Sequence, residues 1–548
     1  MDAITLAIYS QLFAAICDEM GTALMRSAFS PNIKERRDFS TALFTPDGRM
    51  LAQAAHIPVH LGSMGFAVRG VLEALTLHDG DVALLNDPYR GGTHLPDLTV
   101  VTPVHATGRL VGYAATRAHH ADIGGSTPGS MPVARSLAEE GLIIGPCKLV
   151  EAGRINTGVL APLLAAVRTP DERRGDLDAQ TAACRAGAAR LAALCDRDGV
   201  AAVLESMEAV LAHGERVARA AIAELPPGTY RASDRLDDDG FGHLDLPIVC
   251  SLTVEPTGAL VVDFSGTAPQ TEGNLNAVFP VTFAAVAYCL RCLMPPGTPS
   301  SAGCWAPLRL FAPPGTLVNP LPPAPVAAGN VETSQRIVDV VLAALARAVP
   351  HRIPAASAGT MNNLALGGTD PRTGRAFSYY ETIGGGMGGR PGSPGLDAVQ
   401  THMTNTLNTP VESLELHYPL RVERYSLRDG SGGPGLHPGG RGVVREIRAL
   451  ADGVFTLLTE RRRHAPPGAA GGLPGKRGRN LLVEGPGATP PAGTSSTPAT
   501  PSSRHSELLP GKVTRAWKAG DLLRIETPGG GGWGPVPAAG RTGRRQRQ

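Results

Sequence analysis

Two polar loops hold the residues whose types and spacing could do chemistry. They span residues 86–97 and 117–125, and their imidazole and carboxylate groups belong to His94, Asp97, His119, His120 and Asp122. A mixed set of imidazole nitrogens and carboxylate oxygens suits zinc, manganese or iron(II), and is too soft for calcium. Each loop follows an apolar run of strand length, so the loops are expected at adjacent strand ends. The pattern therefore predicts a site for a divalent transition metal.

The alternative is that these loops are only hydrogen-bonded scaffolding. A His and an Asp three residues apart are a weak signal by themselves, because short motifs of this kind have low specificity. Pro96 favours an extended conformation at Leu95, so His94 and Asp97 are not neighbours on a regular helix. The metal interpretation consequently depends on the two loops coming together.

A glycine-rich loop follows a predicted strand at residues 376–383. Residues 384–389 fit the Gly-x-Gly-x-x-Gly pattern of dinucleotide-binding folds. That fold requires a helix whose N-terminus faces the pyrophosphate, and residues 390–395, which contain two prolines, are unsuited to open one. We therefore exclude nucleotide binding here, and the chain contains no Walker-type phosphate loop. Gly385 and Gly386 remain candidates for substrate contact in a substrate-facing or interface loop, with a plain turn as the alternative.

Two further pairs have suggestive spacing. His56 and His60 are four residues apart across Pro58, and either line a site or are hydrogen-bonded loop histidines. Cys289 and Cys292 have the spacing of metal ligands, but no second pair accompanies them and they lie in an apolar run. We interpret the two cysteines as a structural pair.

The composition excludes several classes of function. The chain has 548 residues, of which 42% are hydrophobic and 18% charged, as in soluble globular proteins of two or three domains. A net charge of +2 gives no strong field for nucleic acid or acidic lipid. Acidic residues interrupt the apolar N-terminal segment, so no signal peptide is expected. The eight scattered cysteines are interpreted as reduced thiols, which favours a cytoplasmic location.

Apolar periodicity predicts the elements that must position the two loops. Helical spacing predicts an N-terminal helix over residues 3–29 and two helices over residues 176–223. Strand-length apolar runs at residues 81–85, 98–104 and 110–116 adjoin the two polar loops. With 67 glycines and 48 prolines the chain should also contain many turns and long loops. The expected fold class is mixed α/β (α+β): multi-domain, strand-rich, with long Gly/Pro loops and several packed helices.

The same patterns divide the chain into five parts. A metal-site domain is expected first, then a second α/β region with the glycine-rich loop, a disordered insertion of Gly, Pro, Ser and Thr, a C-terminal strand segment and a basic tail. Their predicted ranges are residues 1–225, 226–484, 485–507, 508–535 and 536–548.

Ordered motifs along nearly the whole chain resemble the hydantoinase B/oxoprolinase family. The matching segments are residues 33–40, 58–64, 80–97, 119–125, 139–141, 167–177, 264–267, 273–274, 329–336, 384–389, 404–406, 410–412, 431–433 and 527–532. The resemblance excludes the predicted insertion and the basic tail. Because His60 lies in one of these motifs, it favours a site lining, and so a substrate contact, for that residue.

The resemblance also implies a ligand set for a metal. In the family the metal is held by an Asp of the first motif, by the His and Asp of the Thr-His-Leu-Pro-Asp loop, and by a His of the His-His pair. The corresponding residues are Asp38, His94, Asp97 and His119, with His120 left open as the alternative ligand. His120 and Asp122 are then candidates for catalytic roles, as a general base or as groups that orient the ligands.

Finally, the resemblance implies a reaction and a partner. Family members work with an ATPase subunit of the hydantoinase A kind, often as a heterotetramer, and open cyclic amides that the partner activates by phosphorylation. This chain is expected to be the metal-bearing subunit of the hydantoinase B kind, which hydrolyses a hydantoin, 5-oxoproline or a related lactam. Two alternatives remain open: a subunit of an acetone- or acetophenone-type carboxylase, and a non-catalytic supporting subunit.

Overall fold

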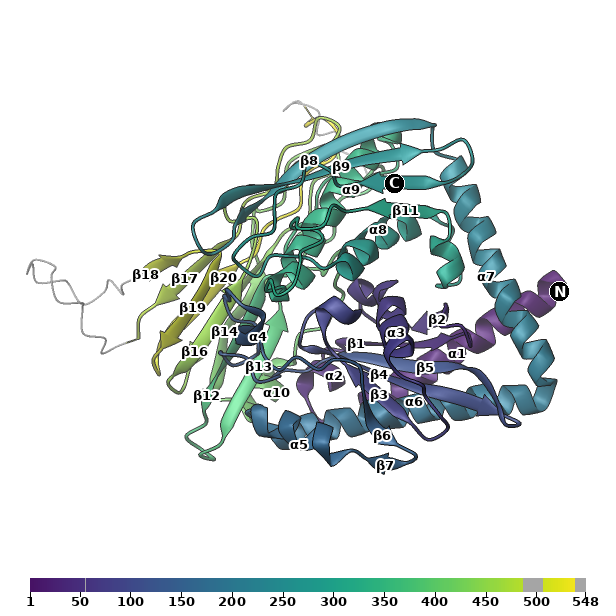
Figure 1. The fold of residues 1–548 in the computed structure, drawn as a ribbon. Helices are drawn as coiled ribbons and strands as arrows, with labels where there is room; N and C mark the ends of the chain where they lie inside the picture. The colour runs from purple at the N-terminus through teal and green to yellow at the C-terminus, as the bar shows by residue number, and fades with distance from the viewer. Residues whose placement is uncertain (55, 486–505, 538–548) are drawn as a thin grey trace, which may run out of the picture.

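The computed structural model describes residues 1–54, 56–485 and 506–537, and shows a mixed α/β fold (Figure 1). A seven-stranded sheet lies at one end of the molecule, a pair of sheets packed face to face lies at the other, and a four-stranded sheet with two long helices completes the structure. The predicted fold class is confirmed. The predicted insertion at 485–507 and the tail at 536–548 fall almost wholly outside the described residues.

The seven-stranded sheet has the order β2-β1-β5-β4-β3-β6-β7, and all its pairings are antiparallel. Its strands are β1 (Phe39–Phe44), β2 (Met50–Ala54), β3 (Val82–Leu85), β4 (Asp97–Ala106), β5 (Arg109–His119), β6 (Cys147–Glu151) and β7 (Arg154–Ile155). The central strands are buried on both faces, which explains why they appear in the sequence as continuous apolar runs. The strands predicted at 81–85, 98–104 and 110–116 are confirmed.

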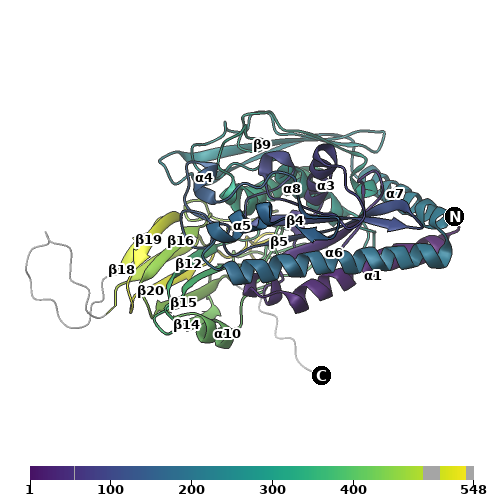
Figure 2. The same ribbon diagram turned by 60° about the horizontal axis from the view of Figure 1, so that its bottom comes forward.

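Helices cover both faces of this sheet. Helices α1 (Ala3–Ser27) and α6 (Pro170–Asp198) lie side by side on one face (Figure 2), and α3 (Ser63–Ala74) packs on the other. Gly187 of α6 allows the close approach of α1, because a Cβ there would lie 2.3 Å from the sulfur of Met20. By length and composition α1 could cross a membrane, but here its apolar stripe packs on α6 and β2. The predicted N-terminal helix is confirmed.

The middle of the chain forms a second sheet with the order β11-β10-β9-β8. Its strands are β8 (Gly228–Asp238), β9 (Leu244–Val254), β10 (Leu260–Asp263) and β11 (Leu308–Phe311). The parallel pair β10–β11 is connected through the buried helix α8 (Phe279–Leu293), and α9 (Ser334–Ala348) packs on β8 and β9. Helix α9 follows directly on a π-helical turn, η4 (Gly329–Thr333).

The connecting helices are mostly on the surface. They are α2 (Pro31–Lys34), α4 (Leu137–Glu140), α5 (Thr157–Ala166), α7 (Val200–Ala223) and α10 (Val411–His417). Helices α6 and α7 confirm the two helices predicted for residues 176–223. The predicted boundary at 225/226 lies between α7 and β8, while one apolar cluster continues across it through Ile222, Leu236 and Leu252. The division into domains therefore stays a prediction.

Two sheets from the C-terminal half pack into a β-sandwich. Their orders are β13-β12-β16-β19 and β14-β15-β20-β17-β18. The strands are β12 (Asn363–Thr369), β13 (Ala376–Thr382), β14 (Leu420–Leu427), β15 (Val443–Ala449), β16 (Gly453–Leu458), β17 (Arg479–Val483), β18 (Ser506–Leu509), β19 (Lys512–Trp517) and β20 (Leu522–Glu526). Alternate residues of both sheets, such as Leu364, Phe455, Ile447 and Leu523, form one shared core.

Glycine-rich segments pack against one another at the edge of the sandwich. Segments 384–389, 431–442, 466–475 and 528–534 run in contact and exchange backbone hydrogen bonds, such as Gly386 N to Pro528 O at 3.0 Å. A Cβ on Gly386 would lie 2.0 Å from the carbonyl oxygen of Gly440, so no side chain fits. The Gly-x-Gly-x-x-Gly loop is thus one layer of a backbone-packed glycine bundle, and no described helix begins directly after it.

The glycine bundle yields a prediction about stability. Gly530→Ala should lower the melting temperature by several degrees, because its Cβ would lie 2.1 Å from the carbonyl oxygen of Met387. Overpacking of this kind costs about 1–3 kcal/mol. The matched control is Gly145→Ala, where no atom lies within 4 Å of the added Cβ. Thermal unfolding of both variants measures the effect, and equal melting temperatures would show that the bundle can relax around a methyl group.

Candidate metal centre

His94, Asp97 and His119 form a compact buried group at neighbouring strand ends. Asp97 is the first residue of β4 and His119 the last of β5, and the antiparallel register sets them directly opposite each other. One ligand atom from each of the three residues lies within 4.8 Å of the other two. The two polar loops therefore meet as predicted, in a geometry that could hold a metal ion.

The hydrogen bonding of the two imidazoles fits a metal. Nε2 of His94 lies 3.0 Å from Oδ1 of Asp97, and Nδ1 of His119 lies 3.4 Å from the same oxygen. Yet neither ring nitrogen of His94 nor Nε2 of His119 makes a hydrogen bond within the described residues, although all three atoms are buried. Buried polar atoms without partners are costly, so a cation that accepts these lone pairs would stabilise the arrangement. The donor set of two imidazoles and a carboxylate suits a divalent transition metal.

Asp97 is held in place from its other side. The hydroxyl of Thr93 donates to Oδ2 at 2.7 Å, and Nε2 of His60 lies 3.3 Å from the same oxygen. Nδ1 of His60 contacts the hydroxyl of Ser40 at 3.0 Å. Burial would raise the pKa of the Asp97 carboxyl, but the surrounding imidazoles outweigh it and hold that pKa well below its ordinary value. Asp97 is therefore a fixed carboxylate with Oδ1 turned to the two candidate ligands.

Asp38 lies on the wall of the same cavity but outside the compact group. Its backbone carbonyl accepts a hydrogen bond from His119 N at 3.0 Å, which ties the end of β5 to the segment before β1. Its carboxylate Oδ2 lies 3.9 Å from Nη2 of the fully buried Arg36. Arg36 also donates to the carbonyl oxygen of Tyr380 at 2.8 Å. The side chain of Asp38 is thus available at the cavity, opposite the three clustered residues.

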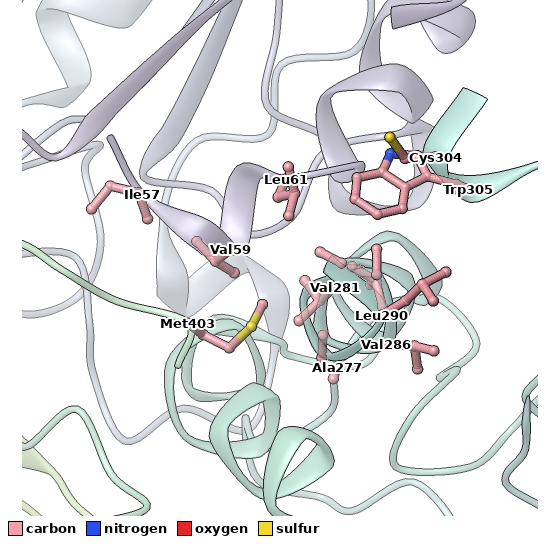
Figure 3. Close-up of a cluster of buried hydrophobic side chains, with 14 of the residues drawn as sticks. Ile57, Val59, Leu61, Ala277, Val281, Val286, Leu290, Cys304, Trp305 and Met403 are labelled. Atoms are coloured by element: carbon pink, nitrogen blue, oxygen red, sulfur yellow. The ribbon is translucent and has the colours of Figure 1, made fainter. Parts of the chain in front are cut away.

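The cavity itself is small and has one polar and one apolar side. Its volume is about 20 Å³, and about 10–15 Å³ is enough to hold one water molecule. The residues that line it are Asp38, Ile57, Val59, His60, Asp97, His119, Asn330, Val331, Met361, Tyr380, Thr382, Met403, Thr404 and Thr406. Ile57, Val59 and Met403 form the apolar side and continue into the packing of helix α8 (Figure 3).

Tyr380 connects the cluster to the β-sandwich. Its ring stacks on the ring of His119, with centroids 4.5 Å apart and planes 16° from parallel. Its hydroxyl donates to Asn363 Oδ1 at 2.7 Å, and the amide of Asn363 donates to Glu332 at 2.7 Å. Burial raises the pKa of the Glu332 carboxyl to about 7. The orientation of the His119 ring is consequently fixed from a distant part of the chain.

His120 and Asp122 lie away from the cavity. Successive residues at a strand end point to opposite sides of the sheet, so His120 faces α6, where Nε2 contacts Gln180 Oε1 at 2.9 Å. Burial lowers the pKa of this imidazole to about 4. Asp122 accepts hydrogen bonds from Arg168 N at 2.5 Å and from Ser130 Oγ at 3.0 Å, which orders the loop after β5. Of the His-His pair, His119 is the residue in the cluster.

The other predicted substrate contacts are divided between two places. His60 lines the cavity, as expected for that residue. Gly385 and Gly386 lie in the glycine bundle, where a Cβ on Gly385 would meet Ala358 at 2.4 Å. His56 packs its ring on Phe39, with centroids 4.5 Å apart.

Two cavity residues have no counterpart in the sequence-based predictions. Asn330 and Tyr380 lie far along the chain from His94, and their residue types carry no metal-ligand spacing. Asn330 Oδ1 is buried without a hydrogen-bond partner within the described residues. Its π-helical turn is rare in proteins and is frequent at functional sites. The one available signal was the Gly329–Arg336 motif, which marked the segment but not the side chain.

Comparison with known proteins places these features in a family. The hydantoinase B/oxoprolinase family model matches residues 2–536. The chain is 41% identical to 5-oxoprolinase 1 of Arabidopsis thaliana over 97% of its own length, and spans 42% of that relative. It is 34% identical to a protein of a Pseudomonas strain that is named as a putative subunit of a D-/L-hydantoinase, covering 97% of this chain and 90% of the relative.

Two solved structures share the fold. One is an ATP-dependent caprolactamase of Pseudomonas jessenii, with a TM-score of 0.88 and 27% identity over 98% of this chain and 93% of that chain. The other is an acetone carboxylase, with a TM-score of 0.87 over 97% of this chain and 76% of that chain. At 21% identity the second likeness concerns the fold alone.

The geometry predicts which histidine of the pair binds metal. Purified protein should contain about one divalent transition metal per chain. His119→Ala should lower that content more than about tenfold, because it removes one of only three clustered ligands. His120→Ala is the matched control, since its ring contacts Gln180 instead, and it should keep its metal. Elemental analysis measures both, and metal loss in His120→Ala alone would contradict the assignment.

Proposed function

The chain belongs to the hydantoinase B/oxoprolinase family, and from that premise we propose that it is the hydrolytic, metal-bearing subunit of an ATP-dependent enzyme that opens cyclic amides. The substrate class is a hydantoin, 5-oxoproline or a related lactam. The observation that supports the proposal most is the buried group His94, Asp97 and His119 beside a cavity. The names of the relatives, which include 5-oxoprolinase, hydantoinase and caprolactamase, support the same reaction class.

The chemistry requires both activation and a nucleophile. An amide is a poor electrophile, and phosphorylation of its oxygen supplies a good leaving group. When bound, a divalent metal supplies Lewis acidity that can lower the pKa of water from about 15.7 to about 7. Asp38, His94, Asp97 and His119 would hold that metal. Zinc, manganese and iron all suit this set of ligands.

The chain's own residues would then orient the reactants. His60 and Thr93 keep the Asp97 carboxylate in one position, and Tyr380 does the same for the ring of His119. The unpartnered Asn330 Oδ1 is available to accept a hydrogen bond from the N–H of a cyclic amide. A cavity of about 20 Å³ holds no five-membered ring, so substrate entry must displace part of the wall. We propose His60 as a substrate contact reached through that movement.

His120 and Asp122 would support the site rather than touch the substrate. His120 connects the end of β5 to Gln180 of α6, and Asp122 connects the following loop to Arg168. Both are buried and hydrogen-bonded on the side away from the cavity. Their proposed role is to keep the His119 backbone in register with Asp97. Gly385 and Gly386 would act in the same structural sense, through the glycine bundle.

ATP would be used on a second chain. This sequence contains no phosphate-binding loop, and its length corresponds to 42% of 5-oxoprolinase 1. The partner we propose is an ATPase subunit of the hydantoinase A kind, in a heterotetramer in the cytoplasm. The reduced state of all eight cysteines is consistent with that compartment.

A ketone carboxylase subunit is the second candidate, favoured by the fold likeness to acetone carboxylase. A purely supporting subunit is a third, and the intact cluster of candidate ligands argues against it. The same ligands could serve either of the first two reactions, so the distinction depends on substrate.

The test of function is a screen of the co-expressed pair. ATP consumption and product formation are measured with hydantoins, 5-oxoproline, lactams and ketones, with and without bicarbonate. We expect ring opening of one cyclic amide with ATP turnover that does not require bicarbonate. Bicarbonate-dependent turnover of a ketone, with no cyclic amide consumed, would replace this proposal by the carboxylase.

Two variants separate the proposed roles inside the cavity. His119→Ala and Asn330→Ala should both lower ring-opened product at least about tenfold, as expected for loss of a hydrogen-bonding or ligating group at the reacting centre. Only His119→Ala should lose metal, because Asn330 lies outside the ligand group. Substrate-dependent ATP hydrolysis should persist in both, since the ATP site lies on the partner. Normal product from either variant would remove that residue from the mechanism.

A further inference from the structure

The largest cavity of the described structure lies away from the metal centre, and it is strongly basic. It has a volume of about 980 Å³ and lies between the β8–β9 turn, the segment 462–479 and the β18–β19 turn. We call it the basic cleft. Its charged lining consists of one carboxylate and seven cations, which are Asp238, Arg428, Arg462, Arg463, Lys476, Arg477, Arg479 and Lys512.

Carboxylates neutralise only part of this charge. Arg428 and Arg479 both pair with Glu526, Arg463 with Asp245, and Lys512 with Glu460 and Asp238. Across the ranges 1–54, 56–485 and 506–537, no carboxylate forms an ion pair with the remaining three cations, which are Arg462, Lys476 and Arg477. The cleft thus has an excess of positive charge in a concave surface, where such charge concentrates anions.

Arg462 is fixed at the inner wall of the cleft. Nη1 donates to Asn362 Oδ1 at 2.7 Å and Nη2 donates to Asn480 Oδ1 at 2.8 Å. Its Nε is buried and makes no hydrogen bond within the described part of the chain. Burial lowers the pKa of this guanidinium to about 10. A preorganised guanidinium held by neutral acceptors, with a donor still unused, is a typical anchor for a bidentate anion.

The opposite wall of the cleft is apolar. Leu244, Leu508, Leu509 and Ala465 line it, and the side chains of Leu244 and Leu508 remain 51% and 66% exposed. Exposed leucines beside unpaired cations form an amphipathic surface. Its volume is within the range of about 300–1,000 Å³ that is usual for sites of small organic ligands.

We propose that the basic cleft is a binding site for a small organic molecule that carries a phosphate group, with Arg462 at its base and Lys476 and Arg477 at its rim. A phosphate monoester carries a charge of about −1.5 to −2 at neutral pH, which suits several unpaired cations better than a single carboxylate does. The apolar wall receives the organic part. This assignment does not depend on the reaction proposed for the metal centre.

The cleft is also close to the metal cavity. Asn362, which accepts from Arg462, follows Met361, which lines the metal cavity. Consecutive Cα atoms are about 3.8 Å apart, so one stretch of backbone before β12 separates the two sites. An occupant of the cleft that repositions Arg462 would therefore act on the wall of the metal cavity.

Calorimetric titration of the full-length chain tests the site with phenyl phosphate, inorganic phosphate and benzoate as probes. Phenyl phosphate, which has both a dianion and an apolar ring, should bind more tightly than the other two. The double variant Lys476→Ala/Arg477→Ala should weaken it at least about tenfold, because it removes two charge-assisted contacts. Arg462→Gln should weaken it as well. Thermal unfolding confirms that each variant is folded.

The control is Arg109→Ala/Arg154→Ala, which removes the same net charge from two exposed arginines of the seven-stranded sheet. It should bind phenyl phosphate as the unmodified chain does. Equal weakening in the control and the cleft variants would overturn the site and indicate a general charge effect. Failure of all three probes to bind, with loss of the partner ATPase from the Lys476/Arg477 variant, would also overturn it and make the cleft a protein interface.

Discussion

The carboxylate of Asp97 is the group on which the site depends. It is buried among three imidazoles and one hydroxyl, and a buried anion is stable only when such partners surround it. Those partners come from different elements: His60 from the turn η1 (Pro58–His60), Thr93 and His94 from the loop before β4, and His119 from β5. Because Asp97 must face all of them, the register of β4 against β5 and the position of η1 are constrained together.

Three parts of the fold close around this carboxylate. The seven-stranded sheet supplies the clustered side chains, the π-helical turn before α9 supplies Asn330, and the β-sandwich supplies Tyr380. Buried ion pairs connect the last two parts: Arg336 of α9 contacts Glu460 at 3.4 Å, and Lys512 contacts the same residue at 2.7 Å. Such pairs contribute little net stability, but breaking one leaves an uncompensated buried charge. They therefore favour a single arrangement of the parts around the cavity.

The glycine bundle shows how local sequence can be informative and yet ambiguous. The segment 384–389 fits a phosphate-binding pattern, and only the absence of a following helix argued against that function. In the structure these glycines let backbones approach each other within hydrogen-bonding distance, with Gly386 against Pro528 and Gly440 against Met387. The physical requirement, the absence of a Cβ, is the same for a bound phosphate and for a neighbouring chain segment. The sequence pattern alone could not distinguish the two.

The sequence by itself determined the local elements and the chemical types at the site. Helix α1, strands β3 to β5 and the pairing of two polar loops follow from periodicity and from turn residues, which act over a few positions. It also predicted His94, Asp97 and His119 as partners, but left His119 and His120 open. Tertiary structure decided that choice, because the end of β5 directs one ring to the cavity and the other to α6. It likewise decided the roles of Asn330, Tyr380 and Arg462, whose neighbours lie 100 or more residues away, beyond any local pattern.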